Sequence, residues 1–190
     1  PYVGATAIAR RKDDPALALP ASPYLRVGIV WAGSPTNRAD SRRSCALKEF
    51  LPVLRTPGVE FFSLQKGERR KDLAELPAEI RVRALDALLG DFGDLAVIVN
   101  QLDLVISVDT AVAHVAGALG RPVWTLLSGA ADWRWGLTGD TAPWYPTMRL
   151  FRQNSPGDWP GVMARVAEAL RRKEWLPRKN PASFPGVEET

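Results

Sequence analysis

Apolar residues fall into short continuous runs along this chain, and segments with helical spacing or polar loops separate the runs. The clearest example is residues 102–128, with the sequence LDLVISVDTAVAHVAGALGRPVWTLLS. It begins with an apolar run, breaks at Asp109 and Thr110, continues through small residues at helical spacing, and ends in a second apolar run. This order predicts a strand, a helix and a second strand. We therefore expect a βαβ unit with two parallel strands.

The same alternation continues on both sides of this unit. Apolar runs predict strands at residues 26–32, 59–64 and 148–152, and residues 80–85 are an ambiguous short strand. Helices are predicted at residues 47–54, from an N-cap at Asp94 to Asn100 or Gln101, and from Asp158 to Leu170. In the first of these, Pro52 either weakens the prediction or places the start of the helix late. Strands that alternate with helices form a mainly parallel sheet covered on both faces. The chain is therefore predicted to be an α/β protein with three αβα layers.

These elements define one domain with a segment at each end. Residues 25–175 hold every predicted strand and helix and are expected to form the domain. Residues 1–24 are rich in proline and alanine and lack a sustained period, which predicts a linker or an N-terminal docking segment. Residues 176–190 are predicted to be an exposed tail. Because the sequence begins with Pro1 and not with methionine, we expect it to be part of a longer protein.

Composition narrows the class of protein and of partner. Of the 190 residues, 46% are hydrophobic and 24% are charged, which is ordinary for a soluble globular protein. No apolar run approaches the roughly 18 residues that a membrane span needs. The net charge of +4 favours anionic partners, but the basic residues are scattered and no nucleic-acid-binding motif stands out. We therefore expect a phosphorylated small molecule as the partner and do not expect nucleic acid.

A single cysteine and a single histidine limit the chemistry further. Cys45 has no second cysteine with which to form an internal disulfide, and this favours a cytoplasmic location. Cys45 and His114 are the only soft metal ligands, so a zinc site is not expected.

The turn at Asp109, Thr110 and Ala111 is the first candidate site. Ligands of α/β proteins bind outside the carboxyl ends of the strands, where a helix N-terminus presents unpaired N–H groups. One interpretation is that these groups and the Thr110 hydroxyl bind phosphate oxygens. The other is that Asp109 is an ordinary N-cap, and both can hold together. His114 follows one turn later, either as a contact to a bound phosphate or sugar or as a core histidine.

Three further loops carry polar or aromatic side chains. Glycine lets the backbone approach a ligand, and arginine binds a diphosphate with two parallel hydrogen bonds. The dinucleotide-binding GxGxxG and the GxxxxGK[ST] phosphate loop are both absent from the sequence. An aromatic loop either stacks a base, closes over a substrate, or packs against a partner domain. The residues are Gly33, Ser34, Asn37, Arg38 and Arg43 after the first strand, Gln65 and Lys66 after the second, and Trp133, Arg134 and Trp135 after the βαβ unit.

Five segments, taken together and in order, resemble a known family. They are similar to the glycosyltransferase domain that follows tetratricopeptide repeats in many bacterial proteins, a domain that resembles the heptosyltransferases. The resemblance covers residues 26–170 and implies half of a GT-B fold, in which two Rossmann-like halves enclose the active site and the C-terminal half binds the nucleotide sugar. The segments are VGIVWAGSPTNRADSRRS, FFSLQKGE, LDLVISVDTAVAHVAGALGRPVW, DWRWG and PWYPTMRLFRQ.

The resemblance implies a role for each candidate. It implies that Asp109, Thr110 and Ala111 cradle the diphosphate of the donor and that His114 lines the same site. It also implies phosphate contacts from Gly33, Ser34 and the loop at residues 37–43, and a place near the nucleoside for Gln65 and Lys66. No metal and no cofactor is implied, because helix dipoles and basic side chains meet the charge of the leaving group, and the nucleotide diphosphate sugar is itself the substrate.

The acceptor-binding half, which carries the catalytic carboxylate in such enzymes, has no room in residues 1–25. We therefore expect the donor-binding half of a metal-independent glycosyltransferase, with its catalytic residue unknown. An acceptor domain or tetratricopeptide repeats are expected in the full-length protein, although no repeat is visible in this sequence.

Two alternatives remain from the sequence. One is a catalytically degenerate domain that serves as a protein-interaction module, with exposed Trp133, Trp135 and Trp144 as its surface. The other is nucleic-acid binding through the basic surface.

Overall fold

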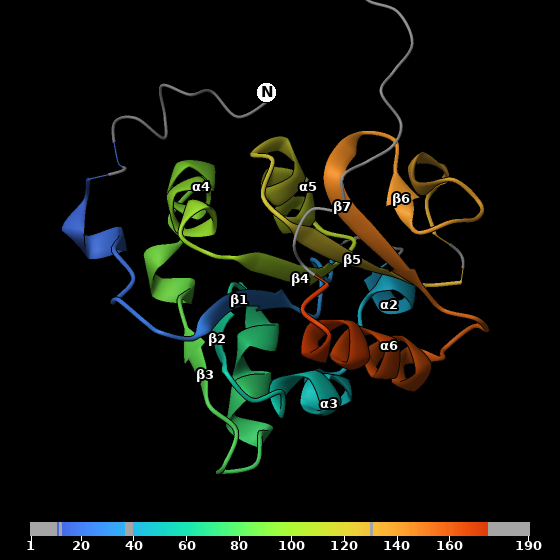
Figure 1. Cartoon of the computed structure of the whole chain (residues 1–190), viewed down its shortest axis with the longest axis horizontal. Coiled ribbons are helices and arrows are strands. Elements are labelled where there is room, and N and C mark those ends of the chain that lie inside the picture. Colours follow the sequence, from blue (N-terminus) through green and yellow to red (C-terminus); the bar gives the residue numbers. More distant parts are fainter. Residues whose placement is uncertain (1–10, 12, 37–39, 130, 175–190) are drawn as a thin grey trace, which may run out of the picture.

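Seven strands form one sheet in the part of the chain that the computed structural model describes, which is residues 11, 13–36, 40–129 and 131–174. The order across the sheet is β3-β2-β1-β4-β5-β7-β6 (Figure 1). β6 is antiparallel to β7, and the other neighbouring strands are parallel. Asn37, Arg38 and the predicted tail at residues 176–190 lie outside the described residues. The strands are β1 (Leu25–Val30), β2 (Val59–Ser63), β3 (Val82–Ala84), β4 (Leu104–Val108), β5 (Val123–Leu127), β6 (Thr141–Ala142) and β7 (Tyr145–Arg152).

Helices cover both faces of the sheet, which confirms the three-layer αβα prediction. α4 (Phe92–Asn100) and α5 (Ala111–Ala118) pack on one face, and α3 (Leu51–Leu54) and α6 (Trp159–Arg171) pack on the other (Figure 1). In the described residues, no helix is both long and apolar enough to cross a membrane. The shorter helices are α2 (Asp40–Arg43) and the 3₁₀ helices η1 (Pro15–Leu17), η2 (Leu47–Phe50), η3 (Glu68–Glu75), η4 (Asp86–Leu88) and η5 (Trp133–Trp135).

The central strands explain why the sequence reads as continuous apolar runs. Every residue of β4 and of β5 is buried, because side chains on both faces meet a helical layer. Along β4, Val105 packs in the cluster under α4 and α5, and Ile106 packs in the cluster under α3 and α6. Successive side chains thus serve opposite layers of the core. The βαβ unit predicted at residues 102–128 is confirmed as β4, α5 and β5.

One predicted helix start is wrong, and a second helix starts late, as Pro52 allowed. The N-cap of α4 is Asp91 and not Asp94, because the Asp91 carboxylate accepts from the N–H groups of Gly93 and Asp94. Asp94 completes a capping box by accepting from the Asp91 N–H. The predicted helix at residues 47–54 begins as the 3₁₀ helix η2 and becomes α-helical only at Leu51. Pro52 lies in the first turn of α3, where its missing N–H costs nothing.

β7 begins three residues before the predicted start at Met148, and its partner β6 was not predicted. Pro146 breaks the apolar pattern in the sequence. The parallel pairing of β7 with β5 starts only at Met148, so the proline lies before that ladder and does not interrupt it.

The chain before β1 lies against α4. Leu17 and Leu19 are buried in the core cluster of that face. The side-chain amide of Gln101 accepts from the Leu19 N–H at 2.8 Å and donates to the Leu17 carbonyl at 2.9 Å. Nearer the N-terminus, Arg11 pairs with Asp91 and Asp94 at the start of α4. This part of residues 1–24 is therefore packed on the domain.

Candidate functional site

A cavity of about 700 Å³ opens at the carboxyl ends of β1 and β2 and at the first turn of α5. Its walls are the loops after β1 and β2, the turn before α4, and the start of α5. In a parallel α/β sheet this edge is where ligands bind. The cavity therefore lies where the sequence predicted the site. The predicted site residues that line it are Gly33, Ser34, Arg43, Gln65, Lys66, Thr110 and Ala111.

The inner wall of the cavity is apolar. Val30, Leu64, Leu89 and Leu95 line it from the ends of the strands and from α4, and Phe92 stands exposed at the rim. Polar side chains line the loops after β1 and β2, the start of α5, and the N-cap of α4, where Asp91 adds a carboxylate. The cavity thus joins an apolar slot to polar and charged groups, a combination that suits a ligand with a flat ring and a polar group.

Thr110, and not Asp109, is the N-cap residue of α5, so the prediction that Asp109 caps the helix is wrong. The Thr110 backbone is extended, with φ −138° and ψ 169°, and the Thr110 side chain makes no capping hydrogen bond to the first turn. The Ser107 hydroxyl donates to the Val108 carbonyl at 2.7 Å, so Thr110 is the donor in its 2.9 Å hydrogen bond to Ser107. The backbone N–H groups at the start of α5 are therefore left to meet an anion.

The loop after β1 is held by a small polar cluster. The Ser44 hydroxyl accepts from the Gly33 N–H at 3.0 Å and donates to Asp40 at 2.9 Å, and Arg43 pairs with the same carboxylate at 3.5 Å. A Cβ at Gly33 would lie 2.3 Å from Asp40 Oδ1, so a larger residue at this position would displace the Asp40 carboxylate. Ser34 bonds Thr36 at 2.7 Å within the loop. The cluster places Arg43 on the cavity wall, and sequence reasoning did not single out Asp40 or Ser44.

Gln65 uses its buried amide to hold the backbone. Its oxygen accepts from the N–H groups of Trp31 and Ala32 at 3.2 and 2.9 Å, and its nitrogen donates to the carbonyls of Ala32 and Lys66 at 3.0 Å each. The amide thereby fixes the exit of β1 into the Gly33 loop. The neighbouring Lys66 donates to the Leu89 carbonyl and links two walls of the cavity.

Asp109 and His114 lie outside the cavity lining, on the side of α5 that faces β7. His114 Nε2 is 3.7 Å from Asp109 Oδ1, and Nδ1 is 3.1 Å from the Tyr145 hydroxyl. The imidazole stacks on Trp135 with ring centroids 5.2 Å apart. Burial lowers the pKa of His114, and Arg134 lowers it further, while Asp109 and Asp132 oppose the shift. His114 is therefore a neutral, half-buried imidazole beside the start of α5.

The aromatic loop divides between core and surface. Trp135 is only 1% exposed and packs under His114, whereas Trp133 is 79% exposed. The prediction that Trp133, Trp135 and Trp144 form one exposed surface is therefore wrong for Trp135. Arg134 pairs with Asp132 at 2.9 Å, which raises the pKa of the guanidinium, and its carbonyl accepts from the Trp144 indole N–H at 3.1 Å.

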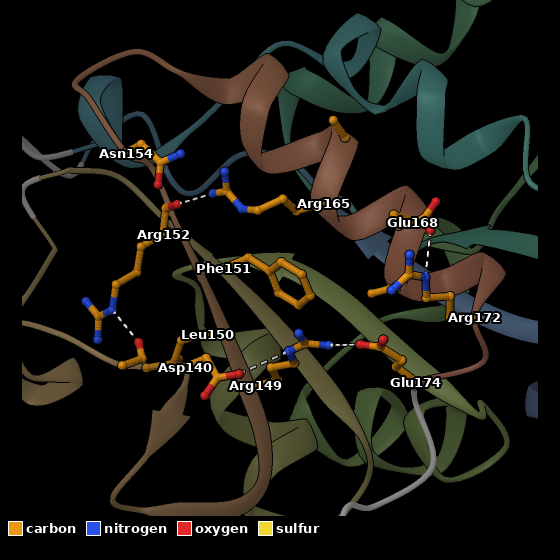
Figure 2. Close-up of a pocket in the computed structure, with 13 residues that line it drawn as sticks. Asp140, Arg149, Leu150, Phe151, Arg152, Asn154, Arg165, Glu168, Arg172 and Glu174 are labelled. Carbon is orange, nitrogen blue, oxygen red and sulfur yellow. Dashed lines mark hydrogen bonds and ion pairs between the residues drawn. The ribbon is translucent and has the colours of Figure 1, made fainter.

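A second hollow of about 610 Å³ lies between β7 and α6, away from α5 (Figure 2). Arginines line this groove, and the carboxylates and carbonyls with which they pair lie in the same groove. Arg149 pairs with Glu174 at 2.6 Å and Arg172 with Glu168 at 2.7 Å (Figure 2). Arg152 donates to the Gly139 carbonyl at 2.9 Å. We place the candidate site at α5, because that cavity and not this groove lies at the carboxyl ends of the parallel strands.

No cluster of three or more His, Cys, Asp or Glu side chains that suits a metal ion occurs among residues with a described position. The charged side chains that line the cavity are Arg43, Lys66 and Asp91, and the start of α5 lies beside them. Arg43, Lys66 and the helix start suit an anion.

Comparison with known proteins gives matches in sequence and in fold. Over 154 residues the chain is 37% identical to Protein FlbA of Caulobacter vibrioides, a match that covers 78% of this chain and 25% of that protein. The fold matches the structure of E. coli ADP-heptose LPS heptosyltransferase II with a TM-score of 0.53 at 16% identity, over 90% of this chain and 53% of that one. The chain thus spans about a quarter and about half of the lengths of these two proteins.

The family match covers the centre of the candidate site. Residues 54–156 match Glycosyltransferase family 9 (heptosyltransferase). This range includes Gln65, Lys66, the start of α5 and the aromatic loop, and it exceeds half of the 190 residues. The sheet order and the two helical layers agree with the fold of the heptosyltransferase structure. The chain belongs to glycosyltransferase family 9, the heptosyltransferase family.

Proposed function

We propose that this chain is the donor-binding part of a glycosyltransferase and that the α5 cavity holds a nucleotide diphosphate sugar. The observation that carries the proposal is the composition of one cavity. It joins an apolar slot to the uncapped N-terminus of α5 and to the Arg43 guanidinium. A nucleoside fits the first part, and a diphosphate fits the second.

The proposed reaction is a direct displacement at the anomeric carbon of the donor. An acceptor hydroxyl attacks that carbon, the bond to the diphosphate breaks, and the nucleoside diphosphate leaves with the bonding electrons. The N–H groups of α5 and Arg43 stabilise the negative charge that develops on the leaving group, without a metal ion. The base that takes the acceptor proton is assigned to a part of the protein outside this chain.

The proposal also includes further domains of the full-length protein. The chain spans only about a quarter of FlbA and half of the heptosyltransferase II chain. An acceptor-binding half, or tetratricopeptide repeats, in the full-length protein would supply the missing wall of the active site. A cytoplasmic location agrees with a nucleotide-sugar donor and with the lone cysteine Cys45.

Calorimetric titration of the chain with ADP, UDP and GDP tests this proposal. At least one of the three is expected to bind, and Arg43→Ala is expected to weaken it by about tenfold or more, since hydrogen bonds to charged groups contribute about 1.5–3 kcal/mol. Arg55→Ala is the matched control, because Arg55 is exposed, lies outside the cavity lining and pairs with Glu79 at 3.6 Å. If no nucleotide binds, or if both variants bind like the wild type, the cavity is not a donor site.

A second candidate is the protein-interaction module, and exposed apolar side chains favour it. Trp133, Leu137 and Trp144 are 79%, 94% and 61% exposed in the segment between β5 and β7. Sedimentation of the chain over a range of concentrations, with Trp133→Ser and Leu137→Ser, tests whether these side chains drive association. If the chain is an interaction module that binds no donor, the wild type is expected to associate and to release no heat when it is titrated with any of the three nucleotides.

A further inference from the structure

Tyr145 occupies a defined place on α5. A Cβ at Gly117 would lie 2.5, 2.8 and 2.9 Å from three atoms of the Tyr145 ring, so the ring lies directly against the helix at this glycine. Any other residue at position 117 would displace it. From there the Tyr145 hydroxyl reaches His114 Nδ1, one turn earlier on the same helix, at 3.1 Å.

The other edge of the His114 ring faces an acceptor. Nε2 lies 3.7 Å from Asp109 Oδ1, and a carboxylate has no proton to donate. A neutral imidazole carries one proton, and electrostatics place that proton on the nitrogen that faces the carboxylate. Nδ1 is then the acceptor, and Tyr145 is the donor. Stacking on Trp135 holds the plane of the ring.

We infer that Tyr145 is a positioning residue, whose hydroxyl donates to His114 Nδ1 and keeps the imidazole neutral with its proton on Nε2, next to Asp109 at the start of α5. The inference rests on the proposed function in one respect, which is that a donor diphosphate binds at this helix start. The tautomer itself does not depend on that proposal. His114 then meets an anionic ligand as an N–H donor of fixed direction.

Burial favours a neutral His114 although two carboxylates lie near the ring. Asp109 faces it from the end of β4, Asp132 and Arg134 from the segment at η5, and Tyr145 from β7. Burial is the largest influence on its pKa and lowers it. Neutral His114 is therefore the form that the folded protein presents at neutral pH.

Nitrogen-15 NMR of the imidazole tests the inference directly. His114 is the only histidine, so protein prepared without a histidine tag gives one imidazole signal set. Above the pKa of the ring, the wild type is expected to show a protonated Nε2 and an unprotonated Nδ1. Tyr145→Phe keeps the ring against Gly117 and is expected to raise the fraction of the Nδ1-protonated tautomer, because only Asp109 then favours the proton on Nε2. Tyr24→Phe, at an exposed tyrosine, is the control and is expected to leave the tautomer unchanged.

Nucleotide binding by the same variants separates this inference from the proposed function. Tyr145→Phe is expected to lower the affinity for the nucleotide that calorimetry selects by about twofold to tenfold, which corresponds to the loss of roughly one neutral hydrogen bond. A protonated Nδ1 in the wild type, or an unchanged tautomer in Tyr145→Phe, overturns the inference whatever the nucleotide data show. A changed tautomer with unchanged affinity overturns the link to the donor site. If no nucleotide binds the wild type, the proposed function fails, and the tautomer is still read from the unliganded chain.

Discussion

At the scale of single residues, the polar side chains near the cavity separate into those that hold the backbone and those that face open space. Gln65 belongs to the first group, since its amide makes four hydrogen bonds to the backbone at the end of β1. His114 lies between the groups, because Tyr145 holds one nitrogen and the other lies near the start of α5. Sequence reasoning found both residues but could not assign these roles, since it had no partner atoms.

Gln65→Ala is expected to destabilise the protein by about 2–4 kcal/mol, because it leaves buried N–H and carbonyl groups of the β1 loop unpaired. Urea denaturation measures the change. Ser34→Ala, at an exposed residue on the same cavity wall, is the control and is expected to change stability by less than about 0.5 kcal/mol. A loss for Gln65→Ala no larger than that of the control would show that the amide is not a structural clamp.

His114 is expected to titrate below its ordinary pKa in the folded chain, because burial disfavours the imidazolium. The unfolded chain therefore binds a proton first as the pH falls. The stability linked to His114 is fully present above the unfolded pKa, and it declines as the pH falls from that value toward the folded one. Proton NMR titration of the one imidazole, with and without urea, measures both midpoints. A folded midpoint at or above the unfolded one contradicts the burial argument.

At the scale of elements, the long buried strands and the helices with clear caps were predictable, and the short or irregular pieces were not. β4, α5 and β5 follow directly from the apolar pattern, and α6 begins after Asp158 as its sequence indicates. β6 has two residues and no pattern of its own, so its pairing with β7 depends on tertiary structure. The prediction of the N-cap of α4 failed because Asp91 and Asp94 are both aspartates near the helix start, and aspartate is a preferred N-cap residue.

Ala111→Pro tests the start of α5 as an anion site. Ala111 is the first helical residue, where proline fits because the N–H has no partner within the helix, and the extended Thr110 before it suits a following proline. The variant is expected to keep its melting temperature within a few degrees and to lose about tenfold or more in nucleotide affinity. Unchanged affinity would show that the Ala111 N–H makes no contact with the ligand.

Gly117→Ala tests the packing of α5 against β7. Alanine favours a helix by about 1 kcal/mol over glycine, but its Cβ would overlap the Tyr145 ring, and overpacking costs about 1–3 kcal/mol. A net loss of stability is expected in urea denaturation. In a Tyr145→Ala background the same substitution is expected to stabilise, because the overlap is gone and only the helix preference remains. The same loss in both backgrounds would exclude the steric account.

At the scale of the whole molecule, the loops that follow the parallel strands and the N-terminus of α5 lie together at one edge of the sheet. β1, β2 and β4 end at this edge, and the cavity gathers seven residues that the sequence had placed on three separate segments. Topology explains why, since parallel strands bring their carboxyl ends together. The sequence did not reveal that Asp109 and His114 lie next to the start of α5 but outside the lining of this cavity. That division depends on which side of the helix each residue occupies.

The most direct test of the account is a crystal structure of the chain with the nucleoside diphosphate that calorimetry selects. We expect the diphosphate at the first N–H groups of α5 and near Arg43, with the base in the slot between Leu64, Leu89 and Leu95. His114 is expected to keep its contact with Tyr145. A diphosphate bound in the arginine-lined groove between β7 and α6, with the α5 cavity empty, would contradict the central claim.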